Sequence, residues 1–248
     1  MQTINISKIT NQSLLGKFLR LPLRLIPKTL KLKVLQGANK EYRWIVGSGV
    51  HGYWLGVYEL YKQRAISACC RKGMVAYDIG AHVGFYTMMF ARLSGKEGRV
   101  YAFEPNTINL NYLKTHIEIN SIENVTILPI ALGQDRGYTF FNEGRDSSTG
   151  HVTVNQTTIM VPLDSIDSLI DKKLIEPPNI IKIDVEGAEL DVLHGARATI
   201  RKYNPIIFIA IDNHDNKDYI YDFLKDMGYV IDCLDNNPYE IKAVTKIK

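Results

Sequence analysis

Glycine and carboxylate residues follow two apolar segments at a spacing that could hold a nucleotide. Asp78 ends the first segment, Gly80 and Gly84 follow it, and Glu104 ends a second segment further along the chain. Glycine lets a backbone approach a ligand closely, and a carboxylate at the end of the next strand can accept hydrogen bonds from ribose hydroxyls. The spacing Asp-x-Gly-x-x-x-Gly differs from the Gly-x-Gly-x-x-Gly of dinucleotide sites. It therefore favours S-adenosylmethionine over NAD as the predicted cofactor.

A second group of polar residues follows two later apolar segments. These residues are Asp184 and Glu186 after one segment, and Asp212, Asn213 and His214 after the other. Ligands of open parallel sheets bind beyond the carboxyl ends of the strands, so both sets are expected at the edge that carries Asp78. Acids on an otherwise apolar strand are costly unless they bind something, and Lys182 is a predicted ion-pair partner for one of them. An imidazole is a common general base, so His214 is predicted to deprotonate an acceptor hydroxyl.

Three other interpretations of these residues stay open. Asp184, Asp212 and Asn213 offer oxygen ligands of the kind that Mg²⁺ accepts, although no dedicated metal site is predicted. Tyr58-x-x-x-Lys62 and Tyr221-x-x-x-Lys225 have the Tyr/Lys spacing of short-chain dehydrogenases, but the glycine spacing does not fit an NAD(P)-dependent oxidoreductase. The third interpretation is a non-catalytic scaffold that binds S-adenosylmethionine and associates with a membrane.

Strands and helices alternate in the pattern of apolar residues. Predicted strands cover 74–78, 100–104, 125–130, 180–184 and 205–211, and predicted helices cover 84–93, 107–119, 188–202 and 216–227. A final strand pair, 229–234 and 240–246, has no helix between its members and predicts one antiparallel strand at the sheet edge. The expected fold is therefore α/β and Rossmann-like, with a mostly parallel seven-stranded sheet. Residues 133–163 are interpreted as a β insertion, and such loops often cover active sites.

Residues 1–72 are predicted to form an N-terminal extension on a core domain of residues 73–248, with a hairpin over 31–46 and a helix over 58–70. The net charge of +4 is uneven: residues 1–40 carry eight basic side chains and no acidic one, which leaves 22 basic against 26 acidic in the remainder. A mildly acidic body argues against nucleic acid as a partner.

Basic residues in the first segment recur at helical spacing opposite an apolar stripe. This pattern predicts an amphipathic helix that either packs on the domain or contacts an anionic membrane surface through residues 13–33. The longest wholly apolar run, Ile206–Ile211, is too short to span a bilayer, and no secretory signal is evident. Three cysteines without a disulfide framework fit a reducing compartment. A cytoplasmic location, with peripheral membrane contact as an option, is expected.

Several of these motifs resemble those of the FkbM-type S-adenosylmethionine-dependent methyltransferases. The resemblance is carried by Trp54–Glu59, Asp78–Thr87, Ala102–Pro105 and Ile181–Glu189, and it extends over roughly residues 30–235. It implies a Rossmann-like class I methyltransferase domain that methylates a hydroxyl of a sugar, a polyketide or another secondary metabolite.

The resemblance also implies roles for single residues. The cofactor-binding set is Asp78, Gly80, Ala81, His82, Gly84, Glu104, Pro105 and Ala131, with Glu59 closing the pocket from the N-terminal region. The catalytic set is His214, Asp184, Glu186 and Asp212, facing a small-molecule or glycan acceptor. His82 stands where the family commonly has Asn, and Asp212 stands where it often has Glu. The predicted reaction is an in-line methyl transfer with His214 as general base.

Overall fold

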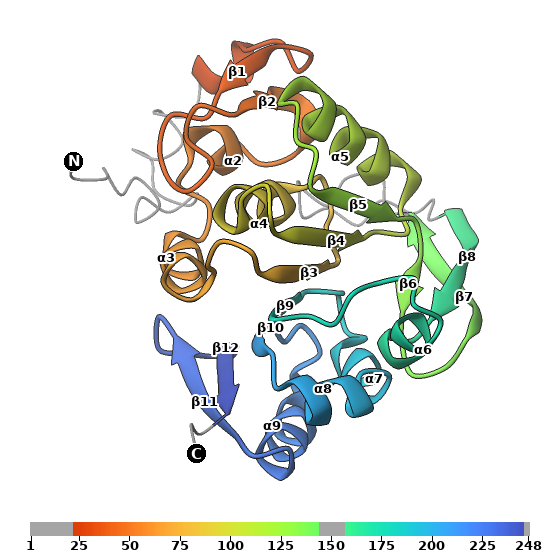
Figure 1. Cartoon of the computed structure of the whole chain (residues 1–248). Coiled ribbons are helices and arrows are strands. Elements are labelled where there is room, and N and C mark those ends of the chain that lie inside the picture. The colour runs from red at the N-terminus through yellow and green to blue at the C-terminus, as the bar shows by residue number, and fades with distance from the viewer. Residues whose placement is uncertain (1–21, 144–156, 246–248) are drawn as a thin grey trace.

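The computed structural model describes residues 22–143 and 157–245 and has a seven-stranded sheet at its centre (Figure 1). In spatial order the strands are β11 (Tyr229–Leu234), β12 (Asn237–Thr245), β10 (Ile206–Ala210), β9 (Ile180–Ile183), β3 (Val75–Ile79), β4 (Arg99–Phe103) and β5 (Val125–Leu128). The five strands from β10 to β5 pair in parallel, so their carboxyl ends share one edge. The chain moves outward from β3 to β5 and then returns to β9, which creates a topological switch point between β3 and β9. The α/β fold and the mostly parallel seven-stranded sheet are confirmed.

The single antiparallel strand does not lie at the edge, where the sequence pattern placed it. β12 pairs antiparallel with both β10 and β11, so it lies one position inside the edge strand β11. The two strands are joined by Asp235 and Asn236, which both have positive φ angles. Either strand of such a hairpin could pair with β10. β12 takes the inner position because Ile241 and Ala243 are completely buried there, whereas β11 is mostly half-buried or exposed.

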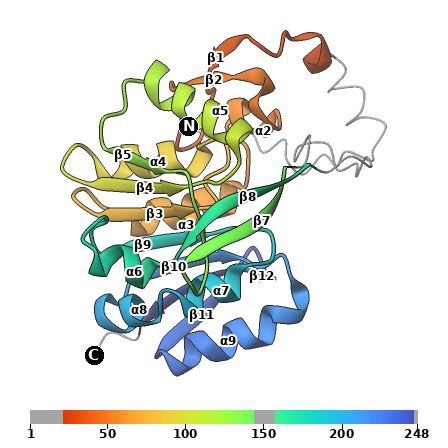
Figure 2. The ribbon, with the colours of Figure 1, turned by 90° about the vertical axis from the view of Figure 1, so that its right-hand side faces the viewer.

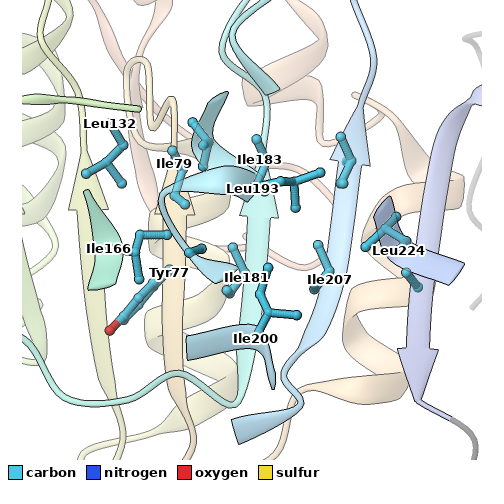
Figure 3. Packing of buried hydrophobic residues seen from close by; sticks show 14 of the residues in the cluster. Tyr77, Ile79, Leu132, Ile166, Ile181, Ile183, Leu193, Ile200, Ile207 and Leu224 are labelled. Carbon is cyan, nitrogen blue, oxygen red and sulfur yellow. The ribbon is translucent and has the colours of Figure 1, made fainter. Parts of the chain in front are cut away.

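Helices cover both faces of the sheet. On one face lie α6 (Ile166–Asp171), α7 (Glu189–His194), α8 (Arg197–Tyr203) and α9 (Lys217–Asp226), and the other face carries α3 (Leu60–Cys69), α4 (Phe85–Ser94) and α5 (Thr107–Ile119). Successive residues of β3 alternate between the two cores: Tyr77 packs with the α6–α9 side (Figure 3), and Ala76 with the α3–α4 side. This alternation is the expected period of two for a strand covered on both faces.

Two helices differ from the pattern-based expectation. The helix predicted over 188–202 is divided into α7 and α8 at Gly195, where an added Cβ would lie only 1.9 Å from the carbonyl oxygen of Gly133. The helix α6 was not predicted. Its first turn is capped by Ser165, whose Oγ accepts a hydrogen bond from the amide of Ser168 at 3.2 Å.

The N-terminal segment contributes a hairpin, β1 (Lys31–Lys33) with β2 (Arg43–Ile45), followed by the short helix α2 (Gly52–Leu55). The predicted amphipathic helix lies largely in residues 1–21, outside the described residues. Its described remainder includes a 3-10 helix, η2, over Pro22–Leu25. Within residues 22–143 and 157–245, no helix is long and apolar enough to cross a membrane.

The β insertion forms a small sheet of its own. β6 (Ala131–Leu132) pairs with β8 (Thr157–Asp164), and β8 pairs antiparallel with β7 (Gly137–Glu143). Figure 2 shows the β7–β8 ribbon crossing in front of the carboxyl edge of the main sheet. The ribbon is therefore placed to form one wall of a site at that edge.

Candidate functional site

A cavity of about 1110 Å³ lies at the carboxyl edge of the main sheet. Its walls include the loop after β3 (Gly80, Ala81, His82), the end of β4 (Glu104, Pro105), the insertion (Ala131, Thr139, Phe140), the end of β9 (Lys182, Asp184, Glu186) and the N-terminal segment (Lys28, Tyr53, Tyr58). Sites for a single drug-sized ligand occupy about 300–1000 Å³, so this cavity has room for a donor and an acceptor together.

The two glycines of the loop after β3 both adopt positive φ angles, and Gly80 is also required by close packing against backbone. Gly80 has a φ of +72°, and an added Cβ would lie 1.8 Å from the carbonyl oxygen of Asp184. Gly84 starts α4 with a φ of +94°, and its Cβ would lie 2.5 Å from Leu113 in α5. The amides of Gly80 and Ala81 both donate to the carbonyl oxygen of Phe103, at 3.0 and 2.9 Å. The loop is thereby held against β4 and the end of β9, and Gly80 and Ala81 line the cavity whereas Gly84 does not.

Glu104 ends β4 inside the cavity and is almost completely buried. One carboxylate oxygen accepts from the amide of His82 at 2.7 Å, and the other accepts from the amide of Asn106 at 2.9 Å and from the side chain of Asn109 at 3.3 Å. Burial raises the pKa of the Glu104 carboxyl, and these three donors oppose that rise. A carboxylate has about four acceptor positions, so three donors leave capacity for a ligand hydroxyl.

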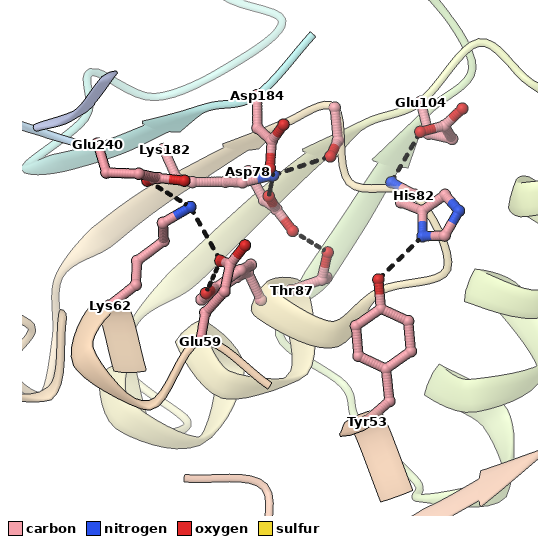
Figure 4. Close-up of polar contacts among 12 residues, drawn as sticks. Tyr53, Glu59, Lys62, Asp78, His82, Thr87, Glu104, Lys182, Asp184 and Glu240 are labelled. Atoms are coloured by element: carbon pink, nitrogen blue, oxygen red, sulfur yellow. Dashed lines mark hydrogen bonds and ion pairs between the residues drawn. The ribbon is translucent and has the colours of Figure 1, made fainter. Parts of the chain in front are cut away.

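Asp78 lies beneath the cavity rather than in its wall. Its carboxylate accepts from Thr87 Oγ1 at 2.6 Å and lies 3.2 Å from the ammonium of Lys182 (Figure 4). Lys182 also donates to the carbonyl oxygen of Gly80 at 2.9 Å and lies 3.4 Å from Asp184. Lys182 thus pairs with two acids from neighbouring strands. Direct contact between Asp78 and a cofactor stays a prediction.

Asp184 and Glu186 both lie in the cavity wall, but their carboxyl pKa values shift in opposite directions. Burial disfavours the charged form of Asp184, but Lys182 and Lys62 outweigh it and hold the pKa of that carboxyl below its usual range. Burial raises the pKa of Glu186, and the negative charges of Asp212 and Asp184 add to the rise. Glu186 also adopts a φ of +54°, a left-handed conformation that is costly for a residue with a side chain and is often found at functional sites.

Besides Asp78 and Gly84, three further predicted site residues lie outside the cavity wall. Asp212 is exposed beyond β10, and its carboxylate accepts a hydrogen bond from the amide of Glu186. The His214 ring stacks on Tyr239, with centroids 3.8 Å apart and planes 18° apart. Glu59 accepts from the Tyr86 hydroxyl at 2.6 Å, so it supports a residue of the wall. Their roles in cofactor binding and catalysis stay predictions.

Two tyrosines and a histidine complete the N-terminal side of the site. Tyr53 and Tyr58 line the cavity but were not among the predicted site residues, although Tyr58 lies within the family-like motif Trp54–Glu59. The Tyr53 hydroxyl lies 3.4 Å from Nδ1 of His82. Burial, with Lys182 nearby, lowers the pKa of His82 to about 4, so its imidazole is neutral at physiological pH.

Two observations concern the metal and NAD(P) interpretations, which both stay open. Among residues 22–143 and 157–245, no group of three His, Cys, Asp or Glu side chains has the geometry of a metal site. Lys62, the lysine of one of the two dehydrogenase-like spacings, lies in the interior between Glu59 at 2.9 Å and Glu240 at 2.8 Å. Its charge is therefore neutralised by two carboxylates.

Comparisons with known proteins agree with this site. The model of the methyltransferase FkbM domain family matches residues 78–231. The chain is 26% identical over 147 residues to the hexuronic acid methyltransferase AglP of Haloferax volcanii, which covers 58% of this chain and 57% of that protein. It is 23% identical over 141 residues to methyltransferase 1 of Beauveria bassiana, covering 48% of this chain and 56% of the relative. The chain thus spans a little over half the length of these curated relatives.

Solved structures show the same fold. The crystal structure of methyltransferase FkbM from Methylobacillus flagellatus matches with a TM-score of 0.50 and 22% identity, over 69% of this chain and 43% of that one. A ribosomal protein L11 methylase from Lactobacillus delbrueckii subsp. bulgaricus matches with a TM-score of 0.51 and 12% identity, over 76% and 78% of the two chains. The fold is that of Rossmann-like methyltransferases. Because the family model matches more than half of the chain, the chain belongs to the FkbM methyltransferase family, which implies S-adenosylmethionine as the cofactor.

Proposed function

We propose that this chain transfers a methyl group from S-adenosylmethionine to a hydroxyl oxygen of a sugar-containing acceptor. The observation that carries the proposal is the continuity of the cavity, which joins the loop of Gly80 and the carboxylate of Glu104 to Asp184 and Glu186. A donor held at the first pair would therefore face an acceptor held at the second. The family match supports methyl transfer, and the hexuronic acid methyltransferase among the relatives supports a sugar acceptor.

The donor side of the cavity fits the cofactor. Gly80 and Ala81 bring backbone to the wall, Glu104 keeps acceptor capacity for ribose hydroxyls, and Ala131 lines the cavity and is proposed to pack on the adenine ring. The sulfonium of the bound cofactor supplies a methyl group that is already activated for displacement. The cavity wall contains five carboxylates and two lysines: Glu104, Asp135, Asp184, Glu186 and Asp191 against Lys28 and Lys182. This excess of carboxylates favours a cationic ligand.

The same charge distribution bears on the acceptor. An anionic acceptor group beside Asp184 and Glu186 would be repelled, whereas a hydroxyl could donate its hydrogen bond to one of these carboxylates. The cavity therefore suits a neutral hydroxyl better than a carboxylate as the methylated group.

Within this proposal, Glu186 takes the proton of the acceptor hydroxyl. A general base works best when its pKa approaches the working pH, and the pKa of Glu186 is raised whereas that of Asp184 is lowered. Asp184, held by Lys182, would orient the acceptor. This assignment differs from the sequence-based prediction of His214 as the base, because Glu186 lines the cavity and the His214 ring stacks on Tyr239.

Isotope-labelled methyl transfer tests the proposal. The full chain would be incubated with S-adenosylmethionine carrying a ¹³C-methyl group and with methyl glycosides of neutral hexoses and of hexuronic acids, and products would be detected by mass spectrometry. We expect labelled O-methyl sugars from the neutral acceptors, a loss of turnover of about 10²–10⁴-fold in Glu186→Gln, and near-wild-type turnover in His214→Ala. Cofactor affinity should stay unchanged in both variants.

Other outcomes would point elsewhere. Loss of turnover in His214→Ala with full activity in Glu186→Gln would restore the histidine as the base. Tight cofactor binding without methylation of any hydroxylated compound would favour the non-catalytic scaffold.

A further inference from the structure

Exposed apolar side chains gather on one face of the β7–β8 ribbon. Tyr138 and Phe140 alternate along β7, and their partners across the ribbon are Pro162 and Met160 on β8, so all four side chains share a face. Tyr138, Phe140 and Met160 are 69%, 79% and 65% exposed. Neither 137–142 nor 157–163 contains a charged residue. Soluble proteins rarely leave a contiguous apolar surface of this kind without a use for it.

This ribbon face borders the mouth of the cavity. Phe140 lines the cavity from the insertion, and Lys28 lines it from the N-terminal segment. Lys28 is flanked in the chain by two further exposed apolar side chains, Leu25 at 84% and Leu30 at 42%. Figure 2 places η2 and the outer end of the ribbon on the same side of the molecule. Two segments far apart in the sequence therefore each contribute a residue to the cavity wall and carry exposed apolar side chains close to that residue in the chain.

The charge of the N-terminal segment indicates what this surface contacts. Lys28 and Lys31 are exposed beside the apolar residues, and the chain has no acidic residue before Glu41. Basic residues combined with exposed Tyr, Phe, Leu and Met side chains suit the interface of an anionic bilayer, where apolar groups enter the headgroup region and lysines meet lipid phosphates. A protein partner would not by itself require this bias toward positive charge.

We propose that Tyr138, Phe140 and Met160, together with Leu25 and Leu30, form a docking surface for an anionic lipid membrane that turns the cavity mouth toward the bilayer. The surface goes beyond the proposed methyl transfer, since docking needs neither cofactor nor acceptor. It would give a membrane-anchored acceptor direct access to the cavity.

Vesicle flotation with the full chain tests this surface. The probes are vesicles of phosphatidylcholine alone and of phosphatidylcholine with phosphatidylglycerol, each at low and high NaCl. The test variant is Tyr138→Ser with Met160→Ser, because neither residue lines the cavity. The control is Leu174→Ser, because Leu174 is similarly exposed, at 60%. It lies two residues before Glu176, which contacts Tyr77 and Arg99, and so lies away from the carboxyl edge of the sheet.

We expect the wild-type chain to float with the anionic vesicles and to be released by salt. The double variant should bind at least about tenfold more weakly, because membrane affinity scales with the apolar area that enters the interface. Leu174→Ser should float like the wild-type chain. Calorimetric binding of S-adenosylmethionine should be unchanged in all three proteins, which separates this test from the test of the proposed function.

Three results would overturn the proposal: no flotation of the wild-type chain, equal flotation of the double variant, or an equal loss in Leu174→Ser. A wild-type chain that is dimeric in solution, with a double variant that is monomeric, would also overturn it, because a second copy of the chain would then cover this face.

Discussion

The ammonium of Lys182 lies 3.2 Å from Oδ1 of Asp78, and neither side chain is more than 4% exposed. The two residues face each other across the parallel pairing of β9 with β3, at the point where the two halves of the sheet meet. The same ammonium holds Asp184 and the carbonyl oxygen of Gly80. One buried cation therefore joins the loop on the donor side to the acid on the acceptor side.

Replacing Lys182 should lower the stability of the fold far more than replacing an exposed lysine. Lys182→Met leaves the buried carboxylate of Asp78 without a counter-charge, which should lower the free energy of unfolding by about 3–5 kcal/mol. The matched control is Lys33→Met, which breaks an exposed ion pair with Glu41 at 2.9 Å and should leave the free energy of unfolding nearly unchanged, because solvent screens this pair. Urea unfolding measures both values, and equal losses in the two variants would contradict the account.

Gly80 should tolerate no side chain. Gly80→Ala adds a Cβ that would lie 1.8 Å from the Asp184 carbonyl oxygen, so we expect a loss of about 3 kcal/mol or more together with weaker cofactor binding. Gly73→Ala is the control, because Gly73 has a similar φ of +81° but no atom within 4 Å of the added Cβ. It should cost about 1–2 kcal/mol and leave cofactor binding intact. Equal losses of stability and of cofactor affinity in the two variants would contradict the close approach of Gly80 to the Asp184 carbonyl oxygen.

Stability should fall as the pH drops through the range of the buried histidines. Nδ1 of His116 donates to the carbonyl oxygen of Val83 at 2.8 Å, and Nε2 accepts from the amide of Ile45 at 3.1 Å, which requires the neutral ring. Burial lowers the pKa of His116 to about 4, from 6.5 in the unfolded chain, although the bond to Val83 opposes the change. Between these values the unfolded state binds a proton that the folded state does not. Stability is therefore complete above pH 6.5 and is lost as the pH falls toward 4.

The expected loss from His116 is about 1.4 kcal/mol per pH unit, or about 2 kcal/mol between pH 6.5 and 5. His82, whose pKa is also lowered to about 4, should add a comparable loss. Urea unfolding at several pH values measures the slope. His116→Asn should reduce the slope, and a wild-type stability that is constant from pH 7 to 5 would contradict these pKa shifts.

The strand-end residues of the site could be read from the sequence because each follows an apolar segment. Glu104 and Asp184 reach the cavity for this reason, since parallel strands end at one edge whatever their order. His214 follows a strand in the same way but does not line the cavity. β12 lies next to β10, and the amide of Ile211 donates to the carbonyl oxygen of Tyr239, which brings the Tyr239 ring against His214. The sequence pattern placed the antiparallel strand at the edge, and so did not predict that β12 pairs with β10.

Contacts between distant segments were equally beyond a sequence pattern. Lys62 lies in α3 and its partner Glu240 lies in β12, far apart in the sequence. Tyr53 and Tyr58 enter the cavity wall only because the N-terminal segment folds back over the loop after β3. Such positions depend on the packing of whole elements and not on local periodicity.

Calorimetric titration of S-adenosylmethionine into wild-type chain and Glu104→Gln tests most directly the claim that this cavity holds the cofactor. The account predicts one bound cofactor per chain and an affinity about 10- to 100-fold lower in Glu104→Gln, because charged hydrogen bonds to the ribose contribute about 1.5–3 kcal/mol. Glu97→Gln, an exposed change near the amino end of β4, should bind like the wild-type chain. No binding by the wild-type chain, or equal affinity of Glu104→Gln and the wild-type chain, would contradict the account.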